Sequence, residues 1–254
     1  MRDSIRLIKQ KMENCPKSDP LWQFWEKDPR KGVQQLIKKH QRALIHENQL
    51  KQHFQEMCDY ETKGFAAGYR LIAGIDEVGR GPLAGPVVAA AVIFPQNFTI
   101  LGLDDSKKLS HEKREILLTK IRETALAIGI GQASVEEIDQ LNIYEATKVA
   151  MMRAVEELDP APDYLLLDAM RLEKAALPQE KIIKGDMLSV SIAAASIVAK
   201  ESRDRLMIEL AAKYPGYGLE RNMGYGTKEH LAGLAQLGAT VIHRKTFAPV
   251  KAVL

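Results

Sequence analysis

The segment 71–81 reads LIAGIDEVGRG, and this stretch decides the fold. Its first five residues are apolar or small, which predicts a buried strand, and Asp76 and Glu77 follow directly. Two carboxylates at the end of an apolar strand are costly to bury unless a cation neutralises them. Carboxylate oxygens are the ligands that hard divalent cations prefer. The alternative is a strand end at which both acids face solvent.

The strand itself limits what the two acids can do together. Neighbouring residues of a regular strand point to opposite faces of the sheet. Asp76 and Glu77 therefore reach one site only if the strand ends or bends there, and Gly79 permits a bend.

Four further segments predict strands in the rest of the chain. They are residues 87–94, 126–133, 164–168 and 182–183. Helices are predicted from Ser110 to about Thr124, after the caps Ser134 and Asn142, and from about Met187 to Lys213. Strands that first resemble hairpins and then alternate with helices indicate an α/β protein. We expect a mixed sheet flanked by helices.

Two more acids stand at predicted strand ends. Asp168 closes the apolar segment 164–168, and Asp186 follows the segment 182–183. Taken singly, Asp168 is typical of a turn or cap and Asp186 of a helix N-cap. Open α/β sheets, however, bind ligands beyond the carboxyl ends of their strands. Four acids gathered there would suit two divalent cations about 4 Å apart, an arrangement used for phosphodiester cleavage.

The glycines after the first strand suggest a competing interpretation, a dinucleotide-binding turn. Gly79, Gly81 and Gly85 have the spacing G-x-G-x-x-x-G, one residue longer than the usual fingerprint. The two preceding acids would repel a pyrophosphate, and residues 87–94 predict a strand where that motif needs a helix. We therefore reject the dinucleotide interpretation.

Residues 1–68 form a distinct, basic region. Apolar side chains recur there at helical spacing, which predicts a helical extension preceding a main domain over residues 69–254. The first 70 residues carry 14 Lys and Arg against 9 Asp and Glu, whereas the whole chain of 254 residues has a net charge of +3. The main domain is therefore slightly acidic, and its net charge does not indicate nucleic-acid binding.

The composition is that of an ordinary globular protein, with 46% apolar and 27% charged residues. No apolar run reaches about 18 residues, and the N-terminus lacks the apolar core of a secretory signal. Cys15 and Cys58 lack metal-ligand spacing, which favours free thiols in a reducing cytoplasm. None of the six histidines shows such spacing either, and His230 and His243 are expected to be structural or close to substrate.

The segment 74–86, GIDEVGRGPLAGP, resembles the signature of the bacterial ribonuclease HII family. Further matching segments follow in the same order: 104–109, the strand ending in Asp168, 184–186, 191–196, 200–204, 224–227 and 243–244. The resemblance covers about residues 69–250. Two positions depart from the family pattern, because Met223 stands where a basic residue is common and Thr246 where serine is common.

The resemblance implies a ribonuclease H-like fold, a mixed five-stranded sheet flanked by helices, with residues 69–254 as the catalytic domain. It implies hydrolysis of the RNA strand of RNA–DNA hybrids. Incision is expected 5′ of single ribonucleotides in duplex DNA, leaving 3′-hydroxyl and 5′-phosphate ends. The implied cofactors are two Mn²⁺ or Mg²⁺ ions. The implied metal ligands and catalytic residues are Asp76, Glu77, Asp168 and Asp186.

The resemblance also implies how substrate is held. Gly79, Arg80, Gly81 and Tyr225 match the elements that read a ribose 2′-hydroxyl, the group that distinguishes RNA from DNA. Tyr225 is expected either to pack on the adjacent deoxyribose or to be a buried loop residue. The partners are RNA–DNA hybrid and ribonucleotide-containing duplex, with no membrane and no obligate protein partner.

Several residues keep two interpretations. Lys107 and Lys184 are expected to contact phosphates, with a solvated charge as the alternative. Trp22 and Trp25 either pack within the extension or stack on a base. The extension itself either adds phosphate contacts or braces the fold. Segment 191–196 is expected to pack a helix against the sheet, and Arg203 and Asp204 are expected to form a structural ion pair or a helix-surface pair. The rival for the whole protein is a hybrid-binding protein without activity.

Overall fold

The computed structural model describes residues 3–16 and 19–254. It contains two compact units, Met1–His53 and Phe54–Leu254, with the long helix α3 (Lys31–Met57) passing from one into the other. The sheet and all the predicted site residues belong to the second unit. Among the described residues, no helix has the length and apolar character needed to cross a membrane.

The first unit is helical, as predicted. Its helices are α1 (Ile5–Asn14), α2 (Leu21–Glu26) and the first part of α3. Trp22 and Trp25 are buried in its core with their rings 5.3 Å apart, edge to face. The remaining core residues are Ile8, Met12, Val33 and Ile37. The prediction that the tryptophans pack within the extension is therefore confirmed.

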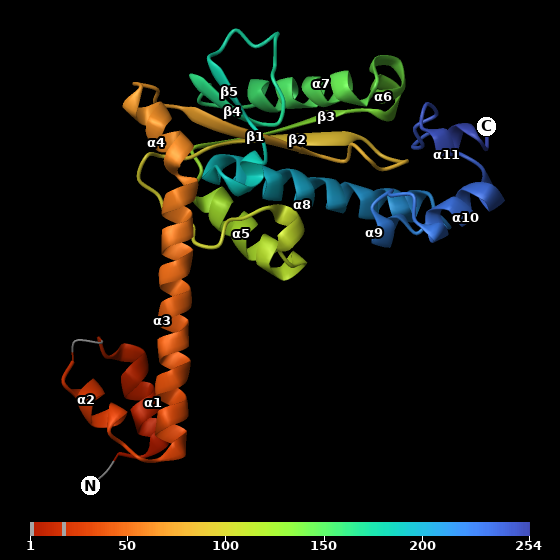
Figure 1. Ribbon diagram of the computed structural model, residues 1–254. Helices are drawn as coiled ribbons and strands as arrows, with labels where there is room; N and C mark the ends of the chain where they lie inside the picture. Colours follow the sequence, from red (N-terminus) through yellow and green to blue (C-terminus); the bar gives the residue numbers. More distant parts are fainter. Residues whose placement is uncertain (1–2, 17–18) are drawn as a thin grey trace. The chain divides into compact units, whose positions relative to one another are not determined.

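The second unit is built on a five-stranded sheet with the order β3-β2-β1-β4-β5 (Figure 1). The strands are β1 (Ile72–Val78), β2 (Val87–Ile93), β3 (Ala127–Ala133), β4 (Tyr164–Asp168) and β5 (Gln179–Ile182). β1, β2 and β3 pair antiparallel, whereas β4 pairs parallel with both β1 and β5. The predicted mixed five-stranded sheet is confirmed. Because β2 follows the glycine-rich turn, the structure also excludes a dinucleotide-binding turn there.

Helices cover both faces of this sheet (Figure 1). The helices α6 (Val135–Leu141) and α7 (Ile143–Glu156) lie on one side, and α8 (Val190–Lys213) lies on the other with α5 (His111–Thr124) beyond it. Side chains of β1 alternate between the two layers. Ala73 and Ile75 belong to the core facing α7, whereas Gly74 lies against α8. An added Cβ at Gly74 would lie 2.2 Å from the carbonyl carbon of Ser191, so this glycine permits close helix–sheet packing.

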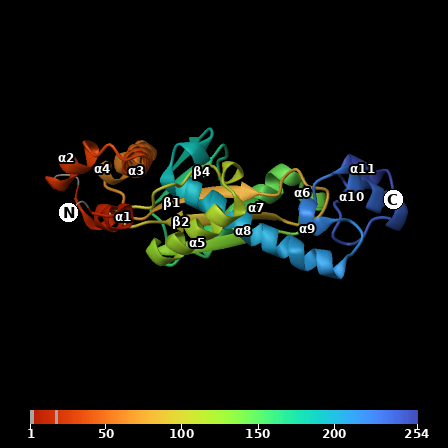
Figure 2. The same ribbon diagram turned by 90° about the horizontal axis from the view of Figure 1, so that it is seen from below.

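Smaller elements complete the unit. They are α4 (Asp59–Ala66), the 3₁₀ turns η1 (Ser106–Lys108) and η2 (Gly185–Met187), and the C-terminal helices α9 (Leu219–Asn222), α10 (Lys228–Leu237) and α11 (Ala248–Lys251). The three C-terminal helices lie past one end of the sheet in both views (Figure 2). They share a separate apolar cluster around Met207, Tyr217 and Leu234.

The predicted helix caps are confirmed, and two boundaries were wrong. Ser110, Ser134 and Asn142 each accept backbone N–H bonds at a helix start, and Ser134 forms a reciprocal capping box. The last strand was predicted at 182–183, but it is β5, which spans Gln179–Ile182. β5 is an edge strand whose exposed polar residues break the apolar pattern by which a strand is predicted. The long helix was predicted from Met187, but η2 comes first and α8 starts after the cap Ser189.

Candidate metal centre

Three of the predicted acids meet at one edge of the sheet. Asp76 lies on β1 and Asp168 ends β4, and the parallel register Ile75↔Leu167 places them side by side. Asp186 lies in η2, four residues beyond the end of β5. The three strands run parallel, so their carboxyl ends open to the same side, where α/β sheets bind ligands.

The three carboxylates are close enough to share a cation. One oxygen of each residue lies within 4.8 Å of the others. Asp76 and Asp186 are buried, and Asp168 is partly buried. Burial, followed by the charges of Glu77 and Asp168, raises the pKa of Asp76 well above its usual value. Burial and the charge of Asp168 likewise raise the pKa of Asp186. Without a cation, these groups therefore oppose one another's ionisation.

Glu77 lies outside this group of three. β1 continues to Val78, and the charge of Glu77 is still close enough to Asp76 to raise its pKa. Its Oε1 accepts a hydrogen bond from Arg80 at 3.3 Å, and its buried Oε2 has no hydrogen-bond partner among the described residues. Burial raises the pKa of Glu77, and Asp168 adds to that rise, so the field of the cluster reaches it.

Backbone and hydroxyl donors hold the cluster in place. The amide of Gly185 donates to Asp168 Oδ1 at 2.7 Å, and the amide of Glu77 donates to Asp76 Oδ1 at 2.8 Å. A hydrogen bond from Ser196 on α8 opposes the rise in the pKa of Asp76. Ser196 was predicted as packing only. The hydrogen bond to Asp76 was not predicted, because serine and alanine are both small and either would suit a helix packed closely on a sheet.

Lys107 and Asp105 border the cluster. The Nζ of Lys107 lies 3.9 Å from Asp186 Oδ2, and 79% of its side chain is exposed. Burial opposes the rise in the pKa of Lys107, but the charges of Asp105 and Asp186 dominate. The charge of Asp105 also contributes to the raised pKa of Asp186. Asp105 was not predicted as part of the site, although its place close to Lys107 in a matched motif was a signal. Lys184, in contrast, is exposed and has a left-handed backbone.

Two buried arginines shape the glycine loop after β1. Arg244 donates to the carbonyls of Gly79, Arg80 and Gly85, and Arg203 donates to those of Ala84, Pro86 and Met223. Gly79 has φ +94, and a Cβ there would lie 2.2 Å from Arg203 Nε. The ring of Tyr225, 46% exposed, lies beside Gly81, where an added Cβ would be 3.5 Å from Cε1. The structure thus brings the predicted sugar-reading residues together, with Tyr225 outside the core.

Arg203 and Asp204 each have partners other than one another. Arg203 is fully buried among backbone carbonyls, whereas Asp204 pairs with Lys200 at 2.7 Å and with Arg114 at 3.8 Å. Adjacent residues of a helix point in different directions, so Arg203 and Asp204 face different neighbours.

The histidines His230 and His243 form a buried chain that ends at Tyr225. The amide of Thr240 donates to His243 Nδ1 at 3.0 Å, so the proton of the neutral His243 ring lies on Nε2. That Nε2 donates to His230 Nε2 at 3.0 Å, and His230 Nδ1 donates to the carbonyl of Tyr225 at 3.0 Å. Burial, followed by His230, lowers the pKa of His243 to about 4. Both rings are fully buried, so their role is structural.

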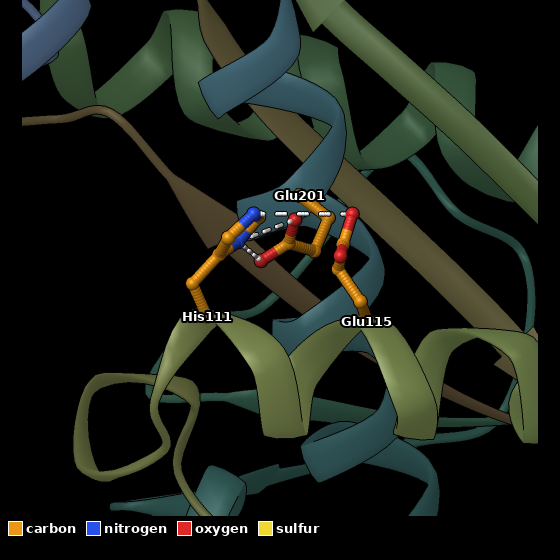
Figure 3. A group of neighbouring side chains, drawn as sticks. All are labelled: His111, Glu115 and Glu201. Atoms are coloured by element: carbon orange, nitrogen blue, oxygen red, sulfur yellow. Dashed lines mark hydrogen bonds and ion pairs between the residues drawn. The ribbon is translucent and has the colours of Figure 1, made fainter.

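A second group of possible ligands lies between α5 and α8 (Figure 3). His111, Glu115 and Glu201 point toward one another, with ligand atoms within 4.8 Å. The i,i+4 spacing of His111 and Glu115 is a signal that the sequence analysis overlooked. Glu201, however, already accepts a 2.6 Å hydrogen bond from Arg114, whose charge disfavours a cation. The group at the sheet edge is therefore the better candidate for a metal centre.

Comparison with known proteins identifies the family. The Ribonuclease HII family model matches residues 73–250, and the model of the Ribonuclease HII N-terminal domain matches residues 4–64. Ribonuclease HII of Leuconostoc mesenteroides is 53% identical over 254 residues, with 100% of both chains covered. Ribonuclease HII of Enterococcus faecalis is 55% identical over 251 residues, with 98% of each chain covered. Ribonuclease H2 of Pyrococcus horikoshii superimposes with a TM-score of 0.60 at 26% identity, covering 72% of this chain and 96% of that chain. The chain therefore belongs to the ribonuclease HII family and is a nuclease of the ribonuclease H type.

Proposed function

We propose that the protein is an endonuclease that hydrolyses the RNA strand of RNA–DNA hybrids and incises 5′ of single ribonucleotides in duplex DNA. The products would carry 3′-hydroxyl and 5′-phosphate ends, and the reaction would use two divalent cations. One observation carries the proposal: carboxylate oxygens of Asp76, Asp168 and Asp186 lie within 4.8 Å of one another beyond three parallel strands. Such an incision would begin the excision of misincorporated ribonucleotides.

The donor set fits a hard divalent cation such as Mg²⁺ or Mn²⁺. All of its donors are carboxylate oxygens, which these ions prefer. The acids are crowded and buried enough to raise the pKa values of Asp76 and Asp186, so positive charge is needed to stabilise their ionised forms. The unpartnered Oε2 of Glu77 is a further oxygen available as a ligand. Bound ions would supply Lewis acidity for activating water and for stabilising the leaving 3′-oxygen.

The residues of the chain would divide the remaining work. Asp76, Glu77, Asp168 and Asp186 would hold the ions through their carboxylate oxygens. The exposed side chain of Lys107 would leave Asp186 and contact a phosphate, and the exposed Lys184 would do the same.

Recognition of the ribose would belong to Gly79, Arg80, Gly81 and Tyr225. Arg203 and Arg244 bind carbonyls of the glycine loop, and the amides of Gly79, Arg80 and Gly81 would face a sugar. Tyr225 would pack on the adjacent deoxyribose, so that a 2′-hydroxyl is accepted on only one side of the junction. We assign this chemistry to residues 69–254 and treat residues 1–68 as an extension.

The test is cleavage of three duplexes of one sequence: an RNA–DNA hybrid, DNA with one ribonucleotide, and all-DNA. Each is incubated with Mg²⁺, with Mn²⁺, or with a chelator. We expect incision on the 5′ side of the ribonucleotide only when metal is present, and none in the all-DNA duplex. Binding without cleavage under every metal would instead support the hybrid-binding protein, and cleavage in the chelator would refute the metal assignment.

A further inference from the structure

Another buried acid, on α4, lies outside the metal centre. Glu61 lies on α4, and only 6% of it is exposed. Its Oε1 accepts hydrogen bonds from the hydroxyl of Ser189 at 2.5 Å, from the amide of Ser191 at 3.1 Å and from the hydroxyl of Ser191. Its Oε2 is buried without a hydrogen-bond partner among the described residues. A carboxylate is costly to bury, so three donors gathered on one oxygen call for an explanation.

The two serines form the start of α8. Ser189 is the N-cap of this helix, and its hydroxyl oxygen accepts a hydrogen bond from the amide of Ile192 at 3.2 Å. The hydroxyl hydrogen is donated to Glu61 at the same time. Glu61 therefore selects the orientation in which the Ser189 oxygen caps the helix. An N-cap contributes about 1 kcal/mol to helix stability and determines where the helix begins.

The cap leads directly to the metal-centre acids. The amide of Ser189 donates to the carbonyl of Gly185 at 2.9 Å, and the amide of Gly185 donates to Asp168 Oδ1 at 2.7 Å. Asp186 is the next residue in this turn. A continuous hydrogen-bonded path thus runs from Glu61 to the turn that carries Asp186 and to the carboxylate of Asp168.

A second path leads to β1. Ser191, the other partner of Glu61, packs on Gly74 so closely that an added Cβ would meet its backbone at 2.2 Å. Gly74 lies two residues before Asp76 on the same face of the strand. Movement of the start of α8 would therefore be transmitted to Asp76 as well.

We propose that Glu61 is a positioning residue of the metal centre: from α4, it fixes the start of α8 and thereby the places of Asp76, Asp168 and Asp186. This inference rests on the proposed function of those acids. It gives the end of the N-terminal extension a role in the reaction, because Glu61 falls within residues 1–68 of the sequence but within the compact unit Phe54–Leu254 of the structure. Groups that orient metal ligands typically change metal affinity or activity by about 10- to 100-fold when they are replaced.

The experiment compares three variants of the full-length protein. Glu61→Asp keeps the charge but shortens the side chain, so it no longer reaches both serines. Glu61→Gln loses the charge but keeps an oxygen that accepts the same three donors. Asp59→Asn removes an exposed carboxylate from the same helix and is the matched control. Three quantities are measured for each variant. Titration calorimetry gives the Mn²⁺ affinity, cleavage of the single-ribonucleotide duplex gives kcat and KM, and thermal unfolding in chelator gives the melting temperature.

We expect Glu61→Asp to weaken Mn²⁺ binding and lower kcat by about tenfold, with little change in KM, because the ligands are displaced and the substrate surface is not. Glu61→Gln should keep the Mn²⁺ affinity and kcat within about threefold of the wild type, because its side-chain oxygen still reaches both serines and the charge matters less than this contact. Asp59→Asn should match the wild type.

Two results would overturn the inference. If Glu61→Asp lowers only the melting temperature, while Mn²⁺ affinity and kcat stay at wild-type values, Glu61 is merely structural. If Glu61→Gln is as impaired as Glu61→Asp, acceptor reach is not what matters. The wild type is measured alongside, and a wild type that binds no Mn²⁺ and cleaves nothing would refute the proposed function together with the inference. A wild type with both properties, beside variants that equal it, would refute the inference alone.

Discussion

The substitution Asp76→Asn should make the metal-free protein more stable while abolishing cleavage. Asp76 is 4% exposed, and burial with the charges of Glu77 and Asp168 raises its pKa. Two unit charges 4.8 Å apart repel by about 3.5 kcal/mol at an effective dielectric constant of about 20. Partial protonation relieves part of this repulsion. We therefore expect the asparagine, which keeps the shape and removes the charge, to stabilise the metal-free protein by about 1 to 3 kcal/mol near pH 8.

The gain in stability of the metal-free Asp76→Asn protein over the wild type should increase with pH. Because the folded-state pKa of Asp76 is raised, the folded protein keeps a proton that the unfolded chain releases above about pH 4. The stability of the wild type relative to Asp76→Asn should therefore fall as pH rises from about 4 through the folded-state pKa. Near pH 4 the two proteins should be equally stable. Mn²⁺ should reverse the order at pH 8, since a bound ligand stabilises the folded wild type by mass action.

The assay is unfolding of both proteins in chelator from about pH 4 to pH 8, repeated with Mn²⁺, together with cleavage of the single-ribonucleotide duplex. For a domain of about this size, each kcal/mol corresponds to roughly 2 to 4 °C in melting temperature. The reasoning fails if Asp76→Asn is less stable than the wild type in chelator at pH 8. It also fails if the variant cleaves at the wild-type rate, or if Mn²⁺ stabilises the two proteins equally.

Three other perturbations test separate parts of the structure. Tyr225→Ala should reduce incision at a lone ribonucleotide while leaving Mn²⁺ affinity unchanged; unchanged kinetics would make Tyr225 a packing residue only. Gly74→Ala should cost at least about 1 to 3 kcal/mol in chemical denaturation, because its Cβ meets the backbone of Ser191; wild-type stability would contradict the close contact. Deleting residues 1–53 should leave the cut site unchanged, because phosphate contacts carry no sequence information. A shallower salt dependence of binding would indicate that the extension contacts phosphates, whereas a lower melting temperature alone would indicate that it braces the fold. A shifted cut site would refute both interpretations.

The local structure was largely predictable from short-range patterns. Apolar runs located β1, β2, β3 and β4, because a buried strand needs apolar side chains on both faces. Ser134 and Glu137 indicated a helix start because a capping box is satisfied within four residues. β5 was displaced in the prediction because Glu180 and Lys181 on an exposed edge strand resemble a loop.

The relative places of the acids were less predictable. Strand alternation predicts that Asp76 and Glu77 diverge, but only the tertiary structure shows that Glu77 lies outside the group of three carboxylates while its charge still acts on Asp76. Their assignment as metal ligands remains a prediction. The roles of Asp105 and Ser196 beside the acids were not predicted, because an acid in a loop and a serine on a helix each have common local explanations.

The sequence by itself determined the chemical groups and the order of the elements: four acids near strand ends, a mixed sheet, and a helical region before it. Only the tertiary structure decided which of these groups meet. The register of β1 with β4 brings Asp76 beside Asp168, and the packing of α4 on α8 brings Glu61 to Ser189 across 128 residues of sequence. Local patterns reflect interactions within a few residues, such as caps and strand alternation. Contacts between distant residues depend on how whole elements pack, which no short segment of the chain encodes alone.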